Sequence, residues 1–372
     1  MEFSVFRQVL IRALGHMQSI VEKRATLPIL MNVKLEVKDD LVLSATNVDL
    51  ELVERVAADI TLGGKTTVPV HMLHDIVRKL PDDAEIKFKQ SGDQLVVSSG
   101  RAIFRLPTLP AENFPMMAGA HLTTKFQMTT GDLAHLINQV KFAIPTDDVR
   151  YHLGGIYFHI TEEGTKKKLT AVATDAQSLA LCTAAAPDGS AEMPAVILPR
   201  RVIGELSKLL EDASVDDATI ELSDTKARFT VGPATLTSKL VDAQYPNYRV
   251  VIPKGNDKIA VIDRKQFIAA VDLVSVASVD KAKSVQLAFS MNKMVATASS
   301  PDFGTATQEI DIEYNGDDTF SIAFSVRILL NIANQIEGDK FQLAMQDSLA
   351  PTVFQSTDKK TDSLFILMPM RM

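Results

Sequence analysis

The chain has 372 residues, of which 46% are hydrophobic and 23% are charged, and its formal net charge is −7 at pH 7. This length predicts two or three domains, and the composition is that of a globular protein with enough apolar residues for each core. The negative charge argues against a protein that grips nucleic acid over its whole surface, but it leaves room for a localised basic face. With no tryptophan and five tyrosines, recognition of single strands by stacking is disfavoured.

The sequence also indicates where the protein works. No apolar run approaches the ~18 residues that a membrane helix needs. The first residues, MEFSVFRQVL, lack the basic start and apolar core of a signal peptide. The single cysteine, Cys182, excludes an intrachain disulfide and lies in an apolar strand, where a packing role is expected. We therefore expect a cytoplasmic protein without membrane contact.

One domain-sized pattern occurs three times along the chain. Each copy opens with a polar start and apolar residues at helical spacing, which predicts first helices within residues 3–17, 126–140 and 260–274. Strands and a Thr-rich strand end follow, and then second helices are predicted within residues 68–80, 198–210 and 324–336. The repeat distance of about 120–135 residues is far above the roughly 20–50 of solenoids. Three tandem copies of one domain suggest a symmetric assembly rather than a single active site.

Between the helices, alternating residues predict short antiparallel strands. The expected turns lie at Asp39-Asp40, at Ser91-Gly92-Asp93, and at Asp224 and Gly232. Asp263 is a good N-cap for the first helix of the third copy. Linkers are expected at residues 115–124 and 246–258. Two helices packed on antiparallel sheets make each copy an α+β domain, and the predicted domains are 1–118, 125–247 and 250–372.

Several motifs could be mistaken for catalytic or metal sites. Gly63-Gly64-Lys65-Thr66 resembles the end of a phosphate-binding loop, but Asp59 stands where that motif needs a glycine. We interpret it as a Gly-Gly hairpin turn. His71 and His74 have helical spacing for a metal pair, yet no nearby ligand completes a site. We therefore expect no catalytic constellation, no metal and no cofactor.

Basic residues are more informative. Many lie on or beside the predicted helices, as Arg7, Arg12 and Arg24 do, whereas much of the acid lies in turns such as Asp82-Asp83. If the helices share one side of the molecule, that side is basic and the turns are acidic. Ordinary solvated helix faces explain the same pattern equally well.

A family resemblance follows from an ordered set of segments. These are TLPIL at 26–30, TLPAENFP at 108–115, ATD at 173–175, SKLVD at 238–242 and FILMPMRM at 365–372. Their order and spacing closely resemble the bacterial DNA polymerase III β subunits, the sliding clamps, along essentially the whole chain. The resemblance implies three tandem clamp domains that form a crescent and dimerise into a closed ring around double-stranded DNA. It implies a processivity factor, not an enzyme.

Candidate site residues come from positions that match the family. Those expected to face DNA are Arg24, Arg150, Tyr151, His152, Arg200 and Arg201, with His152 standing where the family usually has a second tyrosine. The resemblance places a homodimer contact at Phe104 and Leu106 in the first domain, and at Val276 and Ala277 in the last.

The resemblance also implies an apolar pocket for partner peptides. Its partners would be the replicative polymerase alpha subunit, the clamp loader delta subunit and other proteins with clamp-binding peptides. The matching positions are Leu153, Thr174, Leu179, Pro246, Val250, Val251, Leu349, Pro351, Leu367, Met368, Pro369, Met370 and Arg371. The chain departs from the family at Ala176-Gln177-Ser178, where Gly-His-Arg is common, which bears on the polar rim and on peptide preference.

Two other functions stay open from the residues alone. The acidic net charge and the apolar C-terminal segment also suit a peptide-binding hub that does not encircle DNA. A nucleotide hydrolase would rest on Gly63–Thr66 alone, and we expect no turnover from it.

Overall fold

The computed structural model describes residues 1–117, 119, 121–147, 149–278, 284–302, 304–316, 319–358 and 362–371. Contacts divide the chain into two compact units. Unit 1 comprises Met1–Ala134, Pro187–Pro194 and Arg201–Leu240, and unit 2 comprises His135–Ala186, Ala195–Arg200 and Val241–Met372. The units divide the second predicted domain between them, so the boundaries 1–118, 125–247 and 250–372 stay a prediction. Met372, the last residue of the third predicted domain, lies outside the described residues.

Unit 1 holds two antiparallel sheets. The first, in spatial order, is β5 (Asp59–Leu62), β1 (Glu2–Phe6), β7 (Glu85–Ser91), β8 (Gln94–Ser99) and β9 (Ala102–Pro107). The second is β10 (Thr124–Thr129), β15 (Asp217–Leu222), β16 (Lys226–Val231), β17 (Ala234–Lys239), β4 (Leu50–Val56), β3 (Leu41–Thr46), β2 (Asn32–Val37) and β6 (Gly64–Pro69). The pairing of β17 with β4 joins strands from two of the sequence copies into one continuous sheet.

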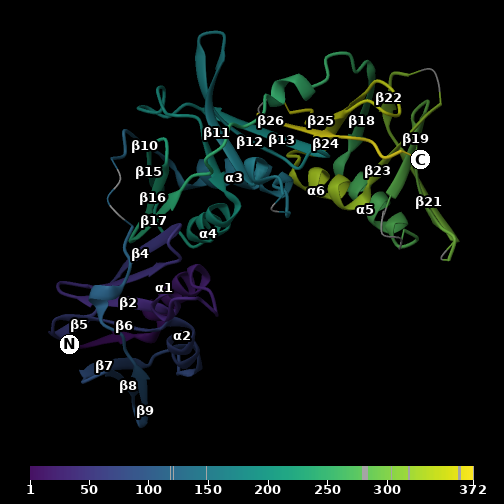
Figure 1. Ribbon diagram of the computed structural model, residues 1–372. Coiled ribbons are helices and arrows are strands. Elements are labelled where there is room, and N and C mark those ends of the chain that lie inside the picture. Colours follow the sequence, from purple (N-terminus) through teal and green to yellow (C-terminus); the bar gives the residue numbers. More distant parts are fainter. Residues whose placement is uncertain are drawn as a thin grey trace. The chain divides into compact units, whose positions relative to one another are not determined.

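Helices α1 (Arg7–Ile20) and α2 (Val70–Lys79) lie side by side in unit 1 (Figure 1). The apolar residues of α1 recur at helical spacing and are buried, among them Leu10, Leu14 and Met17. Arg7 joins the two helices, because its guanidinium donates to the carbonyl oxygens of Val77 at 2.9 Å and of Arg78 at 3.1 Å. A cation at the C-terminal end of α2 satisfies free carbonyls and complements the helix dipole.

A buried histidine of α1 contacts one carboxylate of its own sequence copy and one of the second copy, all within unit 1. His16 Nδ1 lies 2.9 Å from Glu54 Oε2 on β4, and its Nε2 lies 2.9 Å from Asp212 Oδ2, which directly follows α4 (Arg200–Glu211). Burial disfavours the imidazolium, but the hydrogen bonds and charges of Glu54 and Asp212 outweigh it and raise the pKa of His16. His16 is 8% exposed and Glu54 is buried, so water screens this pair little, whereas the Asp212 side chain is 51% exposed and its charge is screened more.

Unit 2 holds the other two antiparallel sheets. The larger, in spatial order, is β14 (Val196–Pro199), β11 (Gly155–Glu163), β12 (Lys166–Thr174), β13 (Ser178–Ala185), β26 (Ser363–Leu367), β25 (Thr352–Ser356), β24 (Lys340–Met345), β18 (Lys258–Asp263) and β22 (Glu313–Tyr314). The smaller is β21 (Gly304–Asp311), β20 (Lys293–Ser300), β19 (Ser284–Ser290) and β23 (Phe320–Ser325). The pairing of β13 with β26 again joins two sequence copies in one sheet (Figure 1).

The remaining helices complete the predicted pattern of two per copy. They are α3 (Thr130–Val140), α5 (Arg264–Ser275) and α6 (Val326–Gln335), and α5 lies beside α6. Asp263 caps α5 as predicted, because its carboxylate accepts from the backbone N–H of Gln266 at 2.9 Å. In unit 2, Phe267 of α5 packs edge-on against Phe341 of β24 with ring centroids 5.1 Å apart. The α+β class with antiparallel sheets is confirmed.

The local turn predictions have mixed outcomes. The turns at Asp39-Asp40 and Ser91–Asp93 are confirmed, because β2 pairs with β3 and β7 pairs with β8 across them. The hairpin predicted at Gly63-Gly64 is wrong: β5 pairs with β1 and β6 pairs with β2, so the chain passes here from one sheet to the other. Glycine is needed because a Cβ on Gly63 would lie 3.0 Å from the Val37 carbonyl oxygen.

Within the described residues, no helix has both the length and the apolar character that crossing a membrane requires.

The raised pKa of His16 predicts a pH-dependent contribution to stability. An imidazolium stabilised by folding contributes fully below its unfolded pKa, near 6.5, and this contribution is lost as the pH rises through the higher folded pKa. His16→Gln should therefore lower the free energy of unfolding by about 1.5–3 kcal/mol at pH 6, the range for hydrogen bonds to charged groups. The difference from the unsubstituted protein should shrink by pH 9.

Urea unfolding at pH 6 and pH 9 measures both differences, with His121→Gln as the matched control because His121 is exposed. A His16→Gln penalty that does not change with pH would contradict the assignment of a charged ring.

Candidate functional site

A pocket of about 410 Å³ lies within unit 2, where three segments of the chain meet. One wall is the turn between β12 and β13, the second is the segment at residues 246–251, and the third comes from the end of β26 and the start of β25. Its lining residues are Leu153, Thr174, Ala176, Gln177, Ser178, Leu179, Pro246, Asn247, Tyr248, Val250, Val251, Pro351, Ile366 and Met368. Most of these side chains are apolar, which suits the burial of apolar side chains of a ligand.

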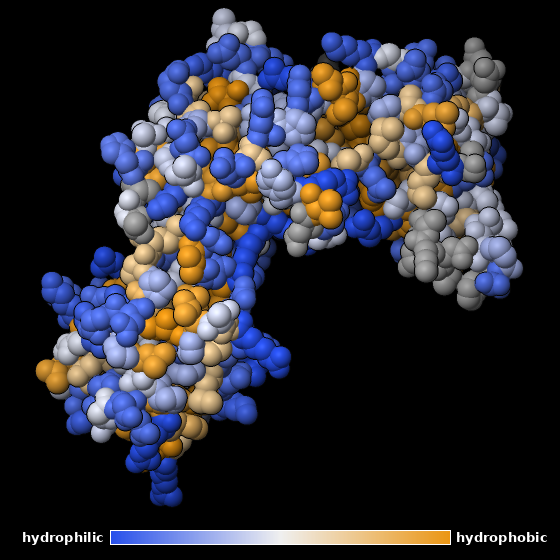
Figure 2. Space-filling model, viewed as in Figure 1, coloured by the Kyte–Doolittle hydropathy of each residue, from blue (hydrophilic) through white to orange (hydrophobic). Residues whose placement is uncertain are grey.

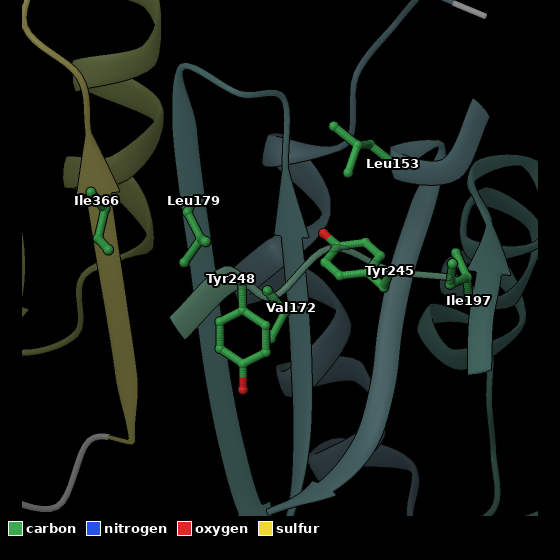
Figure 3. Packing of buried hydrophobic residues seen from close by; sticks show 7 residues of the cluster. All are labelled: Leu153, Val172, Leu179, Ile197, Tyr245, Tyr248 and Ile366. Carbon is green, nitrogen blue, oxygen red and sulfur yellow. The ribbon is translucent and has the colours of Figure 1, made fainter. Parts of the chain in front are cut away.

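The floor of the pocket belongs to a buried apolar cluster (Figure 3). Leu179 on β13 and Ile366 on β26 are direct partners across the two strands. Leu153 and Tyr248 join them from outside the sheet, and both are buried. Because the core under the pocket is packed, the floor is held in place by strand pairing and close packing.

The first wall is a tight turn held by one carboxylate. Asp175 Oδ1 accepts from the backbone N–H of Gln177 at 3.0 Å and of Ser178 at 2.7 Å. Ala176 lies between Asp175 and Gln177 and has a φ of +71°. This left-handed conformation costs a residue with a Cβ about 1–2 kcal/mol. The backbone N–H of Met368 donates to the Gln177 carbonyl at 2.8 Å, which attaches the third wall to the turn.

A column of rings supports the second wall from behind. Tyr245 stacks on Tyr157 with centroids 4.7 Å apart, and Tyr157 stacks on His159 with centroids 4.4 Å apart. His159 Nε2 lies 3.0 Å from the hydroxyl of Tyr248, a lining residue. Burial, and then the nearby charge of Arg249, lowers the pKa of His159 to about 4, so the ring is neutral at physiological pH.

The structure gathers many of the predicted pocket residues in this lining. They are Leu153, Thr174, Leu179, Pro246, Val250, Val251, Pro351 and Met368. Others lie outside it: Leu349, Leu367, Pro369, Met370 and Arg371. Leu367 is 1% exposed and directly follows Ile366 on β26. Because successive side chains of a strand point to opposite faces, Ile366 lines the pocket and Leu367 does not. The Met370 backbone N–H instead donates to the carbonyl oxygen of Ala323, which lies on β23 of the other sheet, at 2.8 Å.

Sequence reasoning missed six lining residues. They are Ala176, Gln177, Ser178, Asn247, Tyr248 and Ile366. A signal was available for two of these places. The sequence departs from the family pattern at Ala176–Ser178, and Tyr248 is the tyrosine of a Pro-x-Tyr sequence that begins at the predicted pocket residue Pro246. Ile366 had none, because only the register of β26 decides which of two adjacent apolar residues faces the pocket.

The candidate DNA-facing residues of unit 1 are both exposed cations. Arg24 is exposed just beyond α1, and Arg201 is exposed in the first turn of α4. Arg201 shares its charge with Glu22 at 3.1 Å and donates to the Ile20 carbonyl at 2.7 Å. Arg201 is therefore anchored beside the end of α1, with part of its charge neutralised.

The candidates of unit 2 cluster around a short 3-10 helix, η4 (Tyr151–Leu153). Tyr151 is 63% exposed and meets the His152 ring edge-on, with centroids 5.8 Å apart. Arg150 donates to Asp147 at 2.9 Å and to the Asp175 carbonyl at 2.6 Å, and it holds the pKa of Asp147 below its usual value. Arg200, also exposed, donates to the Pro145 carbonyl at 3.4 Å.

Figure 2 shows hydrophilic residues over most of the visible surface of each unit.

The candidate dimer residues lie on an edge strand of unit 1 and directly after a helix of unit 2. β9 is an edge strand of its sheet. Phe104 on β9 lines a hollow of about 740 Å³, and Met72 and Ile76 of α2 line it too, with Leu80 directly after that helix. Leu106, by contrast, is 1% exposed and packs inside unit 1. At the end of α5, Val276 is 75% exposed whereas Ala277 is buried. Of the four residues, the exposed parts of Phe104 and Val276 are thus free for a partner.

The remaining motifs form no catalytic site in the described residues. Lys65 pairs with Glu112 at 3.1 Å. Within the described ranges, no group of three or more His, Cys, Asp or Glu side chains could hold a metal ion. Cys182 is buried, and burial raises the pKa of its thiol to about 11, so it is an unreactive thiol.

Comparison with known proteins covers the whole chain. Family models match the DNA polymerase III beta subunit N-terminal domain at residues 1–118, central domain at 127–247 and C-terminal domain at 249–371. The chain is 40% identical to the beta sliding clamp of Caulobacter vibrioides and 35% identical to that of Pseudomonas aeruginosa, each over 100% of both chains. A solved sliding clamp from Bartonella birtlesii bound to griselimycin is 38% identical, with a TM-score of 0.96 over 100% of both chains.

The left-handed conformation of Ala176 predicts that glycine is better here. Ala176→Gly should raise the free energy of unfolding by about 0.5–1 kcal/mol, because relief of the steric cost exceeds the extra entropy of glycine in the unfolded chain. The reciprocal control is Gly164→Ala in the turn between β11 and β12, where φ is +60°. It should destabilise the protein by a similar amount. Urea unfolding compares the variants, and a stability loss on Ala176→Gly would show that the turn is not strained.

Proposed function

Because the chain belongs to the DNA polymerase III beta subunit family, the beta sliding clamps, we propose that two copies close into a ring around double-stranded DNA. Family membership makes the chain a non-catalytic subunit and a processivity factor, with DNA and polymerase as partners. The observation that carries the ring proposal is the likeness to solved sliding clamps over the whole length of the chain. A ring holds DNA by topology, so its contacts need not be tight.

The proposed DNA contacts suit a protein that slides. Arg24, Arg200 and Arg201 are exposed, and Arg150 is partly exposed, so they can reach backbone phosphates without reading bases. Arg150 and Arg201 already pair with acids, which reduces the positive charge they offer. Tyr151 and His152 can donate hydrogen bonds to phosphate. A weak and salt-dependent attraction results, and it lets the ring move along any sequence.

The pocket of unit 2 is proposed to bind short peptides of partner proteins. Its apolar lining takes apolar side chains, and Met368 adapts to different shapes. The replicative polymerase alpha subunit and the clamp loader delta subunit are the proposed partners, with other clamp-binding peptides competing for the same pocket. Griselimycin, which the relative from Bartonella birtlesii binds, is proposed to occupy it as well.

The proposed dimer joins β9 of one copy to β21 of the next. Both are edge strands with unpaired backbone groups, which favour antiparallel extension of a sheet across the contact. The hollow beside Phe104 has an apolar side formed by α2, and in unit 2 Leu273 and Val276 are exposed at the end of α5. Insertion of these side chains into the hollow would bury apolar surface on both copies. A head-to-tail contact closes into a ring when its rotation divides a full turn, and two copies would complete the ring here.

Phe104→Ala should weaken the dimer, because truncating an aromatic anchor at the centre of an interface removes much of its binding energy. We expect the dimer dissociation constant to rise by about tenfold or more, measured by sedimentation equilibrium. The control is Phe6→Ala, since Phe6 is 56% exposed in the same unit but does not line the hollow. An unchanged dissociation constant for Phe104→Ala would remove this residue from the contact.

Topological linkage tests the ring directly. After loading by a compatible clamp loader, the protein should stay on closed circular DNA and run off the same DNA once it is linearised. Equal and salt-sensitive binding to both forms would contradict encirclement and favour the alternative, a peptide-binding hub. Deleting Met368–Met372 tests the pocket separately, because it should abolish the binding of partner proteins, the clamp loader among them, and leave the dimer intact in sedimentation equilibrium.

A further inference from the structure

One wall of the pocket is not part of any sheet. Pro246, Asn247, Tyr248, Val250 and Val251 all line the pocket, and they lie in or directly before the short 3-10 helix η5 (Tyr248–Val251). Among the described residues they pair with no strand, and the backbone N–H of Val250 bonds only within the segment, to the Asn247 carbonyl at 3.4 Å, so side-chain contacts attach the segment to the sheet. Val250 is 75% exposed and Val251 is 48% exposed, which leaves Tyr248 as the buried anchor of the wall.

Tyr248 is anchored by a histidine that does not touch the pocket. His159 lies on β11, is 8% exposed, and meets the Tyr248 ring at 65° with centroids 5.6 Å apart. The 3.0 Å contact between His159 Nε2 and the Tyr248 hydroxyl is buried. On its other face His159 stacks under Tyr157, which in turn stacks on Tyr245 at an interplanar angle of 5°. The column thus attaches both Tyr245 and Tyr248 to β11.

The surroundings of His159 keep its ring neutral. Among the described residues, the titratable or charged groups that contact it or act on its charge are Tyr157 on β11 and Tyr248 and Arg249 on η5. None of them is acidic, and the charge of Arg249 opposes a second cation. Arg249 itself lies over the Tyr248 ring, 6.0 Å from its centroid. A neutral imidazole can accept at Nε2, and the Tyr248 hydroxyl can then donate to it.

We propose that His159 is a positioning residue for ligand binding: by accepting the Tyr248 hydroxyl and stacking under Tyr157, it holds the 245–251 wall in the shape that the ligand needs. The proposal rests on the proposed function of the pocket as a ligand site. Because a buried hydroxyl without a partner is unfavourable, loss of the His159 acceptor should shift Tyr248, which lines the pocket, from its position.

Three variants isolate the hydrogen bond from the stack. His159→Phe keeps an aromatic ring but removes the acceptor, Tyr248→Phe removes the donor, and the double variant replaces both partners by apolar groups of similar shape. Replacing both partners is close to neutral, whereas removing one leaves a buried polar group unpaired. The double variant is therefore expected to recover what His159→Phe loses. Val285→Ala in β19 is the stability control, since Val285 is fully buried in the other sheet of unit 2.

Two measurements are made on the full-length chain. Amide hydrogen exchange of residues 245–251 without ligand should become faster in His159→Phe and return toward the unsubstituted rate in the double variant. Griselimycin affinity, by calorimetry, should fall about three- to tenfold in His159→Phe and recover in the double variant. Val285→Ala should lower the melting temperature and leave both readouts unchanged.

The outcomes separate this inference from the function on which it rests. Unchanged exchange at 245–251 in His159→Phe overturns the positioning role, and so does an unchanged affinity when the unsubstituted protein binds griselimycin. A double variant no better than His159→Phe also overturns it, because the loss then comes from packing alone. If the unsubstituted protein does not bind griselimycin, the proposed ligand is wrong, while hydrogen exchange still decides whether His159 positions the wall.

Discussion

The structure depends on the need of edge strands for hydrogen-bond partners. Backbone groups at a sheet edge are costly to bury unpaired and prone to pair with other chains. The chain meets this need by pairing strands of successive copies, β4 with β17 and β13 with β26. The second pairing also makes the pocket, because it places Ile366 opposite Leu179 and brings Met368 to the Gln177 carbonyl. The edges at β9 and β21 remain for the proposed contact between two copies.

The charges of the chain are arranged so that its attraction to DNA is weak. The chain carries a net charge of −7, and at least two of its candidate DNA-facing arginines already have acidic neighbours, Asp147 and Glu22. Such a surface attracts phosphates weakly, which suits a protein that must stay mobile on DNA. The two buried histidines show how local surroundings decide charge: His16 lies between two carboxylates, whereas His159 lies among aromatic rings beside a cation. One favours the imidazolium and the other the neutral ring.

What the sequence could predict was local. Helical spacing and N-cap chemistry located α1 and α5, and turn residues located the hairpins at Asp39-Asp40 and Gly92, because these depend on neighbours in the chain. Gly63-Gly64 was misjudged, since its strands pair with β1 and β2 far away rather than with each other. In the pocket, family positions such as Leu179 and Pro246 were reachable, but the choice of Ile366 over Leu367 depends on strand register. His159 gave no signal, because it acts through rings that only the fold brings together.

The segment that follows Val241 connects two of the sequence copies and at the same time forms a wall of the pocket. Ordinary connectors tolerate insertions and deletions, because nothing depends on their length. Here Tyr245 and Tyr248 must both reach the same stack of rings, although only Pro246 and Asn247 lie between them in the chain. Adding or removing one residue between them would break the stack. This connector should therefore keep its length while its exposed positions vary, and grafting experiments that exchange the third copy between relatives should join the chains after residue 251.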